Sequence, residues 1–277
     1  MLRLAPLLLL ITAGAALQAA GTWSVLTLPQ QPGRVSNPAA VAVDGAGNLY
    51  EAETYPYNRV QKRDPQGNWS IITTRGNGPG QVTNPAGVAV DGVGNLFVSE
   101  GYSNRAGSGD RVQERDSHGN WTVLATRGAE PGQVSDPRGL AVDAAGTLYV
   151  ADDFNSRIQQ RDPKGHWSVL AHDVPDPYDA VNPTDVAVDG AGSLYVLESF
   201  GLLHKRDPQG RWSTLATRGH LSDPRGLAVD GAGNLYVSED GNGYGRIRKR
   251  DPQGRWSVIG VVAQLPRGRI RLRRPSD

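Results

Sequence analysis

The sequence of 277 residues contains no cysteine, which excludes disulfide bonds, thiolate nucleophiles and thiolate metal sites. It also lacks a charge bias: 29 Lys and Arg face 28 Asp and Glu, a formal net charge of +1. A near-neutral chain has no overall attraction to polyanions, so we expect no nucleic-acid partner.

Long hydrophobic runs are absent after the first 20 residues. Residues 1–20 carry a cation at Arg3, an apolar run to about Ala16, and small residues at Ala19 and Ala20. This is the pattern of a secretory signal peptide, with cleavage after one of those two alanines. The run is too short for a comfortable membrane span. We expect an exported protein, periplasmic or extracellular, with no membrane span after cleavage; an uncleaved N-terminal anchor is the alternative.

One phrase recurs throughout the chain. The sequence "GTWSVL" at 21–26 returns in five later copies, each of which ends a unit that begins like "NPAGVAVDGVGNLFVSE". Aligned on the aspartate of "AVD", the units stand 47, 52, 46 and 41 residues apart. These aspartates are Asp44, Asp91, Asp143, Asp189 and Asp230. The five units cover about residues 36–74, 83–126, 135–171, 181–216 and 222–260.

Each unit contains four strand-sized segments separated by turn signals. In the fifth unit, "DGAGN" (230–234) has the glycine and Asp/Asn content of a tight hairpin turn, and "DPQG" (251–254) fits a type I turn. With 35 Gly and 19 Pro, the composition favours short strands over helices. A unit this small buries too little alone and must pack against its neighbours.

Four strands in each repeated unit predict an all-β fold, a β-propeller of four-stranded blades. The inner strand, such as "GVAV", is apolar without alternation, as in a strand that is covered on both sides. Two sets of aromatic residues are expected to pack between blades. They are Tyr50, Phe97, Tyr149, Tyr195 and Tyr236 in the second strand, and Trp69, Trp121, Trp167, Trp212 and Trp256 in the fourth.

The units resemble NHL repeats. The resemblance is carried by Pro-x-Gly-Val/Leu-Ala-Val-Asp, then Gly-Asn/Thr/Ser-Leu-Tyr/Phe-Val, an acid, and Arg-Val/Ile-Gln/Arg, over about residues 36–260. It implies a propeller fold. It does not select an activity, because NHL-like propellers include binders of proteins, peptides and RNA, sensor domains and a few enzymes.

The first copy, at residues 21–28, has the fourth strand of a unit without its predecessors. The tail "GRIRLRRPSD" (268–277) is similar to "GRIRKRDPQG" (245–254) of the fifth unit. Propellers commonly close by pairing strands from both termini, which removes an exposed edge. We therefore expect a partial sixth blade built from 267–277 and 21–28. A truncated tail would look the same, so five- and six-bladed closure both stay open.

Variable loops precede strand one and follow strand two of each unit, and both sets lie on one face of a propeller. Loops on a rigid scaffold commonly hold binding sites. Strand two ends in an acid in every unit: Glu53, Glu100, Asp152, Glu198 and Glu239. Strand three begins with Arg59, Arg111, Arg157 and Arg246 in four of them. We expect structural ion pairs, and because Leu202 takes the arginine position in unit four, we expect Glu198 to be the acid most available to a ligand.

An aromatic residue follows that acid in each unit. The set is Tyr55, Tyr102, Phe154 and Phe200, with Tyr244 slightly later in unit five. These rings either shield the blade junctions or form stacking platforms around the channel mouth. With Glu198 they are our predicted ligand-binding residues.

An Asn or Asp precedes the proline of each inner strand: Asn37, Asn84, Asp136, Asn182 and Asp223. Turn formation before proline explains them. The alternative is an oxygen ring for Ca²⁺ or another divalent cation, such as the central metal that gluconolactonase-like propellers carry. A metal site needs ligands that differ from blade to blade, whereas these five positions are nearly uniform. We therefore expect no cofactor.

No histidine recurs at one position, so a convergent histidine or zinc site is not expected. The arginines of the tail, residues 267–274, alternate with apolar residues and fit a solvated strand face. Without an asymmetric catalytic cluster, we expect a monomeric, non-catalytic binding or scaffold module for an extracytoplasmic glycan, peptide or protein. The alternative is a metal-dependent lactonase-like hydrolase or a lyase with its site at the central channel.

Overall fold

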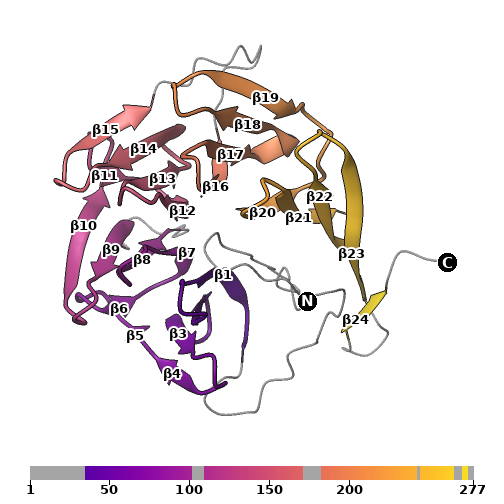
Figure 1. The fold of residues 1–277 in the computed structure, drawn as a ribbon. Coiled ribbons are helices and arrows are strands. Elements are labelled where there is room, and N and C mark those ends of the chain that lie inside the picture. The colour runs from indigo at the N-terminus through magenta and orange to yellow at the C-terminus, as the bar shows by residue number, and fades with distance from the viewer. Residues whose placement is uncertain (1–34, 102–108, 171–181, 242–243, 265–269, 274–277) are drawn as a thin grey trace.

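The computed structural model describes residues 35–101, 109–170, 182–241, 244–264 and 270–273, with backbone only for 241, 244, 262–264 and 270–273. Within these ranges the chain is a β-propeller of five blades around a central axis (Figure 1). The predicted all-β propeller of four-stranded blades is confirmed. No helix in the described ranges is long and apolar enough to cross a bilayer.

Each blade is an antiparallel meander whose first strand lies nearest the axis. Blade 1 contains β1 (Pro38–Val43), β2 (Leu49–Glu53), β3 (Arg59–Arg63) and β4 (Trp69–Ile71). Blade 2 contains β7 (Pro85–Val90), β8 (Leu96–Glu100), β9 (Arg111–Arg115) and β10 (Trp121–Arg127). Blade 3 contains β12 (Pro137–Val142), β13 (Leu148–Asp152), β14 (Arg157–Arg161) and β15 (Trp167–Leu170).

Blade 4 contains β16 (Pro183–Val188), β17 (Leu194–Glu198), a 3-10 turn (Ser199–Gly201), β18 (Leu203–Arg206) and β19 (Trp212–Ala216). Blade 5 contains β20 (Pro224–Val229), β21 (Leu235–Gly241), β22 (Tyr244–Arg250) and β23 (Trp256–Gln264). Two short parallel pairs lie in the loops that lead to the next blade. They are β5 (Thr74–Arg75) with β6 (Gln81–Val82), and β10 with β11 (Gln133–Val134).

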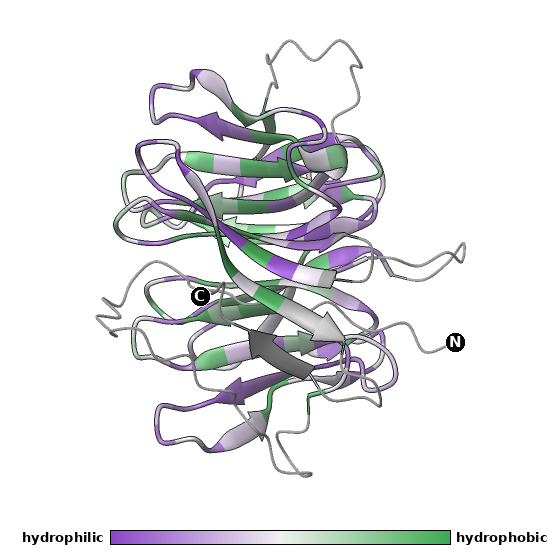
Figure 2. Cartoon of the chain, turned by 90° about the vertical axis from the view of Figure 1, so that its right-hand side faces the viewer, coloured by the Kyte–Doolittle hydropathy of each residue, from purple (hydrophilic) through white to green (hydrophobic). Residues whose placement is uncertain are grey.

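The repeated aspartates build the turns that were predicted from "DGxGN". Asp44 Oδ1 accepts the N–H groups of Ala46 and Asn48, at 3.0 and 2.8 Å, and Asp44 Oδ2 accepts the Tyr50 hydroxyl. Gly47 occupies the left-handed region at φ 81°, which a glycine adopts without strain. Side views show hydrophilic residues at such turns and apolar residues along the strands (Figure 2).

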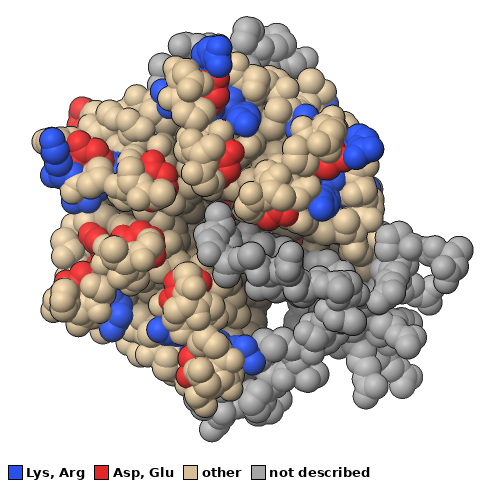
Figure 3. Space-filling view, in the orientation of Figure 1, with Lys and Arg blue, Asp and Glu red and all other residues tan. Residues whose placement is uncertain are grey.

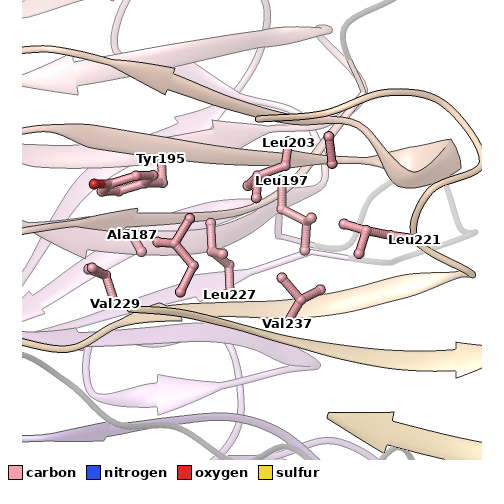
Figure 4. Close-up of a cluster of buried hydrophobic side chains, with 10 residues drawn as sticks. Ala187, Tyr195, Leu197, Leu203, Leu221, Leu227, Val229 and Val237 are labelled. Carbon is pink, nitrogen blue, oxygen red and sulfur yellow. The ribbon is translucent and has the colours of Figure 1, made fainter. Parts of the chain in front are cut away.

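Apolar side chains fill the junctions between consecutive blades. Between blades 4 and 5, Tyr195, Leu197 and Leu203 face Leu227 and Val237 (Figure 4). Trp256 packs against this cluster, and Trp121, Trp167 and Trp212 do the same at the three preceding junctions, as predicted. The described residues form four such clusters; they form none between blades 5 and 1.

The prediction of a six-bladed ring is not supported, because the described strands form five blades. Residues 21–28 lie outside the described residues. Strand β24 (Ile270–Arg273), which we had placed in a sixth blade, instead pairs antiparallel with β23 and extends the outer edge of blade 5. The cause is β23, which continues past its repeat to Gln264 and offers a free edge to the tail.

Candidate active site

The acids that end strand two are structural, as the pairing of adjacent strands predicted. Arg59, Arg111, Arg157 and Arg246 each form an ion pair with the acid of their own blade. In blade 3, Arg157 also donates to the carbonyl oxygens of Ala129 and Gln133 at 2.5 and 2.9 Å, so it ties the loop before β12 to the blade. These acids are buried and committed to the fold.

Glu198 does not reach the surface. Only 1% of the residue is exposed, and one of its oxygens lies 3.6 Å from Nε2 of buried His204, which replaces the glutamine of blades 1 to 3. The expectation that Glu198 is the most available acid is therefore wrong. Leu202, which takes the place of the arginine, is itself buried.

The predicted aromatic platforms lie on the surface where the structure describes them. Tyr55, Phe154 and Phe200 are 70, 76 and 60% exposed. The Phe200 ring lies under the guanidinium of Arg218, with the Arg218 Cζ 4.6 Å from the ring centroid. Tyr102 lies outside the described residues, and for Tyr244 only the backbone is described. Their role in ligand binding stays a prediction.

The Asn and Asp residues before the inner strands form turns, as the proline that follows each of them predicted. Their part in a metal site stays a prediction. Asn37, Asn84, Asp136 and Asp223 adopt φ between 47 and 57°, the left-handed turn conformation. Both carboxylates of the set are paired with cations: Asp136 with Arg138 and Asp223 with Arg225. The carbonyl oxygen of Asn182 accepts the N–H of Ser199. The described ranges hold no group of three or more His, Asp or Glu arranged to bind an ion.

A different acid breaks the symmetry of the channel. The third residue of the inner strand is Ala40, Gly87, Gly139 and Gly226 in four blades, but Asp185 in blade 4. The register shift between Pro183 and Asp185 occurs at the same place in all five inner strands, so the backbone here follows the repeat and only the side chain departs from it.

The Asp185 carboxylate lies between the two neighbouring blades. Its Oδ2 accepts the N–H of Leu227 in blade 5 at 2.7 Å, and its Oδ1 accepts the N–H of Val186 at 2.9 Å. On the other side lies Gly139 of blade 3, where a Cβ would be 2.0 Å from Asp185 Oδ1. Glycine at 139 is thus required by the acid that it faces.

Asp185 lines a cavity of about 140 Å³ at the centre of the ring, where the five inner strands converge. The rest of the wall is mostly Ala, Val and Gly, with one arginine, Arg225. Burial raises the pKa of Asp185 to about 7, against the lowering effect of the two N–H groups. Figure 3 shows a hollow at the centre of this face, with acidic and basic groups interspersed around it.

A second acid departs from the repeat. Glu51 replaces the valine of the other blades in strand two, and both of its oxygens are buried without a hydrogen bond. Burial, and then the nearby Glu53, raise the pKa of Glu51 to about 8. It lies one strand away from the channel lining and does not contribute to the cavity.

Sequence reasoning missed Asp185 and Arg225. Both lie in the apolar inner strands, inside "NPTDVAV" and "DPRGLAV", which we had treated as scaffold. A comparison of the repeats position by position would have found Asp185, because small residues occupy the third position in the other four units. It would not have singled out Arg225, because Arg138 occupies the same second position in unit three.

The fold resembles those of several solved enzymes. Virginiamycin B lyase from Staphylococcus aureus matches with a TM-score of 0.59 and 12% identity, over 85% of this chain and 83% of that one. A streptogramin B lyase matches at 0.58 and 16%, over 83 and 74%. A gluconolactonase from Xanthomonas campestris matches at 0.59 and 18%, over 80 and 74%. No family model matches the sequence, and no curated protein matches it.

These comparisons show that the chain shares the propeller fold, and they correct one expectation. The propellers that it resembles are two lyases and a gluconolactonase, so the comparisons do not support the expectation of a binding scaffold. The argument for a scaffold was the absence of an asymmetric group. That argument fails, because Asp185 is such a group.

Proposed function

We propose that this chain is an enzyme, a lactonase-like hydrolase or a lyase, with Asp185 as the acid–base group at the central channel. One observation carries the proposal: four of the five equivalent channel positions hold Gly or Ala, and the fifth holds a carboxyl group in a largely apolar cavity. The resemblance in fold to a gluconolactonase and to two lyases supports the same reaction classes.

The position of Asp185 suits proton transfer. With a pKa of about 7, the carboxyl is present in both protonation states near neutral pH, where a general acid–base group works best. The N–H groups of Leu227 and Val186 each hold one carboxylate oxygen in place, and the remaining lone pair of each oxygen can face a substrate. A group that is charged and solvated at all times would be a weaker base of this kind.

In a hydrolase, ionised Asp185 accepts a proton from water while the water oxygen adds to the carbonyl carbon of the lactone. The carboxyl then returns the proton to the departing ring oxygen, and the ring opens to a hydroxy acid. In a lyase, Asp185 instead accepts a proton from the carbon beside the carbonyl, and the carbon–oxygen bond breaks as a double bond forms. The first route adds one water to the mass of the substrate, and the second adds nothing.

The proposal is tested by incubating the purified protein with gluconolactone and with quinupristin, which a solved structure of an inactive virginiamycin B lyase of similar fold contains, and measuring the product mass. Asp185→Asn should lower kcat on the accepted substrate about 10²- to 10⁴-fold, the usual contribution of a general acid–base group. The control is Arg255→Ala, which alters an exposed turn on the far side of blade 5 from the cavity. Turnover by Asp185→Asn at the wild-type rate, or wild-type protein inert on both substrates, would contradict the proposal.

The repeat pattern also supports a relation to NHL repeats. The N-terminal copy of the fourth strand supports a second proposal, that the N-terminal segment acts as a clasp that closes the ring. We propose that residues 21–28 close the ring between blades 5 and 1, where the described residues form no apolar cluster. Deletion of 21–28 should then expose a strand edge and promote aggregation. A monomeric deletion variant of unchanged stability would show that this segment is not the clasp.

We also propose that the protein is exported, because residues 1–20 have the pattern of a secretory signal peptide. A fusion of residues 1–20 to a reporter that is active only outside the cytoplasm should give signal, and Leu8→Arg within the apolar run should abolish it.

A further inference from the structure

Two arginines occupy the second position of an inner strand, and the structure uses them differently. The other blades have Ala39, Ala86 and Thr184 at this position. In blade 3, Arg138 Nε lies 2.7 Å from Asp153, and Arg138 Nη2 lies 3.2 Å from Asp136. Both of these acids are buried, so Arg138 is held by two partners inside the protein.

Arg225 has a looser attachment. Its Nη2 lies 2.7 Å from Asp223, two residues earlier in the chain, and the two side chains are 43 and 52% exposed. Exposed pairs of this kind contribute little, because water and salt compete for both charges. A ligand anion can therefore replace Asp223 at small cost, whereas no anion can replace the buried partners of Arg138.

Arg225 also stands at the candidate site. It lines the same cavity as Asp185, and Leu227, two residues further along β20, donates the hydrogen bond that holds Asp185. A guanidinium presents a flat row of donors that matches the two oxygens of a carboxylate. The rest of the cavity is largely apolar and, at about 140 Å³, has the size of a cavity that accepts benzene.

We propose that Arg225 is the anion-binding residue of this cavity and that it binds the carboxylate of a small organic acid. The apolar wall takes the short carbon chain, and Asp185 lies within the same space. This deepens the proposed function, since lactone opening converts a neutral ester into an acid of this class. Binding of the acid does not depend on turnover, so the two proposals can fail separately.

The test is a titration of the full chain with butanoate, a carboxylate with a short apolar chain. Binding is followed by the amide signal of Leu227 in NMR spectra and by calorimetry. Arg225→Ala should weaken butanoate binding at least tenfold. The affinity of Arg225→Lys should lie between those of the wild type and Arg225→Ala, because lysine keeps the charge and loses the flat fork. Asp223→Asn should strengthen binding a few-fold by removing the competing carboxylate.

The matched control is Arg255→Ala. Arg255 is also exposed and lies 2.7 Å from its aspartate, but it stands on a turn and does not line the cavity. It should leave butanoate binding unchanged. No binding by the wild type, wild-type affinity in Arg225→Ala, an equal loss in Arg255→Ala, or tighter binding of inorganic phosphate than of butanoate would each overturn the proposal.

Asp185→Asn separates this proposal from the proposed function. It should still bind butanoate while turnover is lost. If turnover depends on Asp185 but butanoate binds without Arg225, the inference fails alone. If butanoate binding requires Arg225 but neither substrate is turned over, the proposed function fails alone.

Discussion

Blades 3 and 4 have the same four strands but hold them together by different means. In blade 3, Asp152 and Arg157 lie 2.8 Å apart, and Arg157 reaches three carbonyl oxygens of the preceding loop. In blade 4, Leu202 replaces the arginine, and buried Glu198 faces His204 instead. Blade 3 thus anchors its loop through an arginine, and blade 4 has a buried histidine beside its acid.

The two blades also differ at the channel. Blade 3 presents Gly139, which has no side chain, and blade 4 presents Asp185 directly opposite it. The extra carboxylate fits only because the neighbouring blade leaves the space empty. The comparison teaches that the positions shared by the repeats build the scaffold, and that the candidate acid–base group lies where a single blade departs from them.

The largest expected effect comes from giving blade 3 the pattern of blade 4. Arg157→Leu leaves Asp152 buried without its cation, since the histidine that faces the acid in blade 4 is a glutamine, Gln159, in blade 3. Removing one partner of a buried pair costs about 3–5 kcal/mol, so the free energy of unfolding in urea should fall by that amount.

The control for this variant is Arg211→Ala, which breaks an exposed pair with Asp207. Its cost should lie within about 1 kcal/mol. A similarly small loss in Arg157→Leu would mean that blade 3, like blade 4, does not depend on its ion pair.

A smaller effect is expected at the channel, and it depends on pH. Burial raises the pKa of Asp185 from 3.8 to about 7, so the folded state favours the neutral acid and ionisation destabilises it. The contribution of Asp185 should therefore be most favourable below pH 4 and be lost as pH rises toward 7. Asn cannot ionise, and its amide oxygen can still accept the Leu227 N–H.

Between pH 4.5 and pH 8, the free energy of unfolding of Asp185→Asn should therefore rise relative to that of the wild type by about 1–3 kcal/mol. This is less than the full pKa shift would give, because the residue partly faces the channel. The measurement is urea unfolding of both proteins at each pH. If the free energies of unfolding of the two proteins change with pH in parallel, the pKa of Asp185 is not raised, and the acid–base role loses its support. Blade 3 has Gly139 at the equivalent position and therefore contributes no titrating group to this pH dependence.

The sequence predicted the fold because each unit repeats its turn chemistry. Asp44 and its four equivalents recur with glycine three residues later, and each of them directly follows an inner strand. Each tryptophan of the fourth strand follows the aspartate of the second turn by five residues. The ion pairs of the second and third strands followed from strand adjacency. These features depend on local spacing, which a single sequence contains.

The candidate site could not be predicted in the same way. The contact of Asp185 with Leu227 joins residues 42 positions apart, in different blades. The burial of Glu198 depends on His204 and Leu202, whose positions relative to the acid were unknown. The place of β24 depends on the length of β23, which no repeat signal marks. In each case the decisive contact lies between segments that the repeat pattern does not relate.

The smallest effect on stability is expected from the exposed rings that both blades carry. Phe154 in blade 3 and Phe200 in blade 4 occupy equivalent places, and both are mostly exposed. Replacing both with Ala should change the melting temperature very little, because exposed rings bury little area. Phe200→Ala alone should cost more than Phe154→Ala, by about 0.5–1 kcal/mol, since only Phe200 has a described contact with a guanidinium, that of Arg218. The measurement is thermal unfolding of the two single variants and the double variant.

If the double variant unfolds readily, the rings are wedges between blades. If instead it melts as the wild type does but loses substrate affinity by about 1 kcal/mol per ring, they are platforms at the channel mouth, and blade 4 differs from blade 3 in chemistry alone.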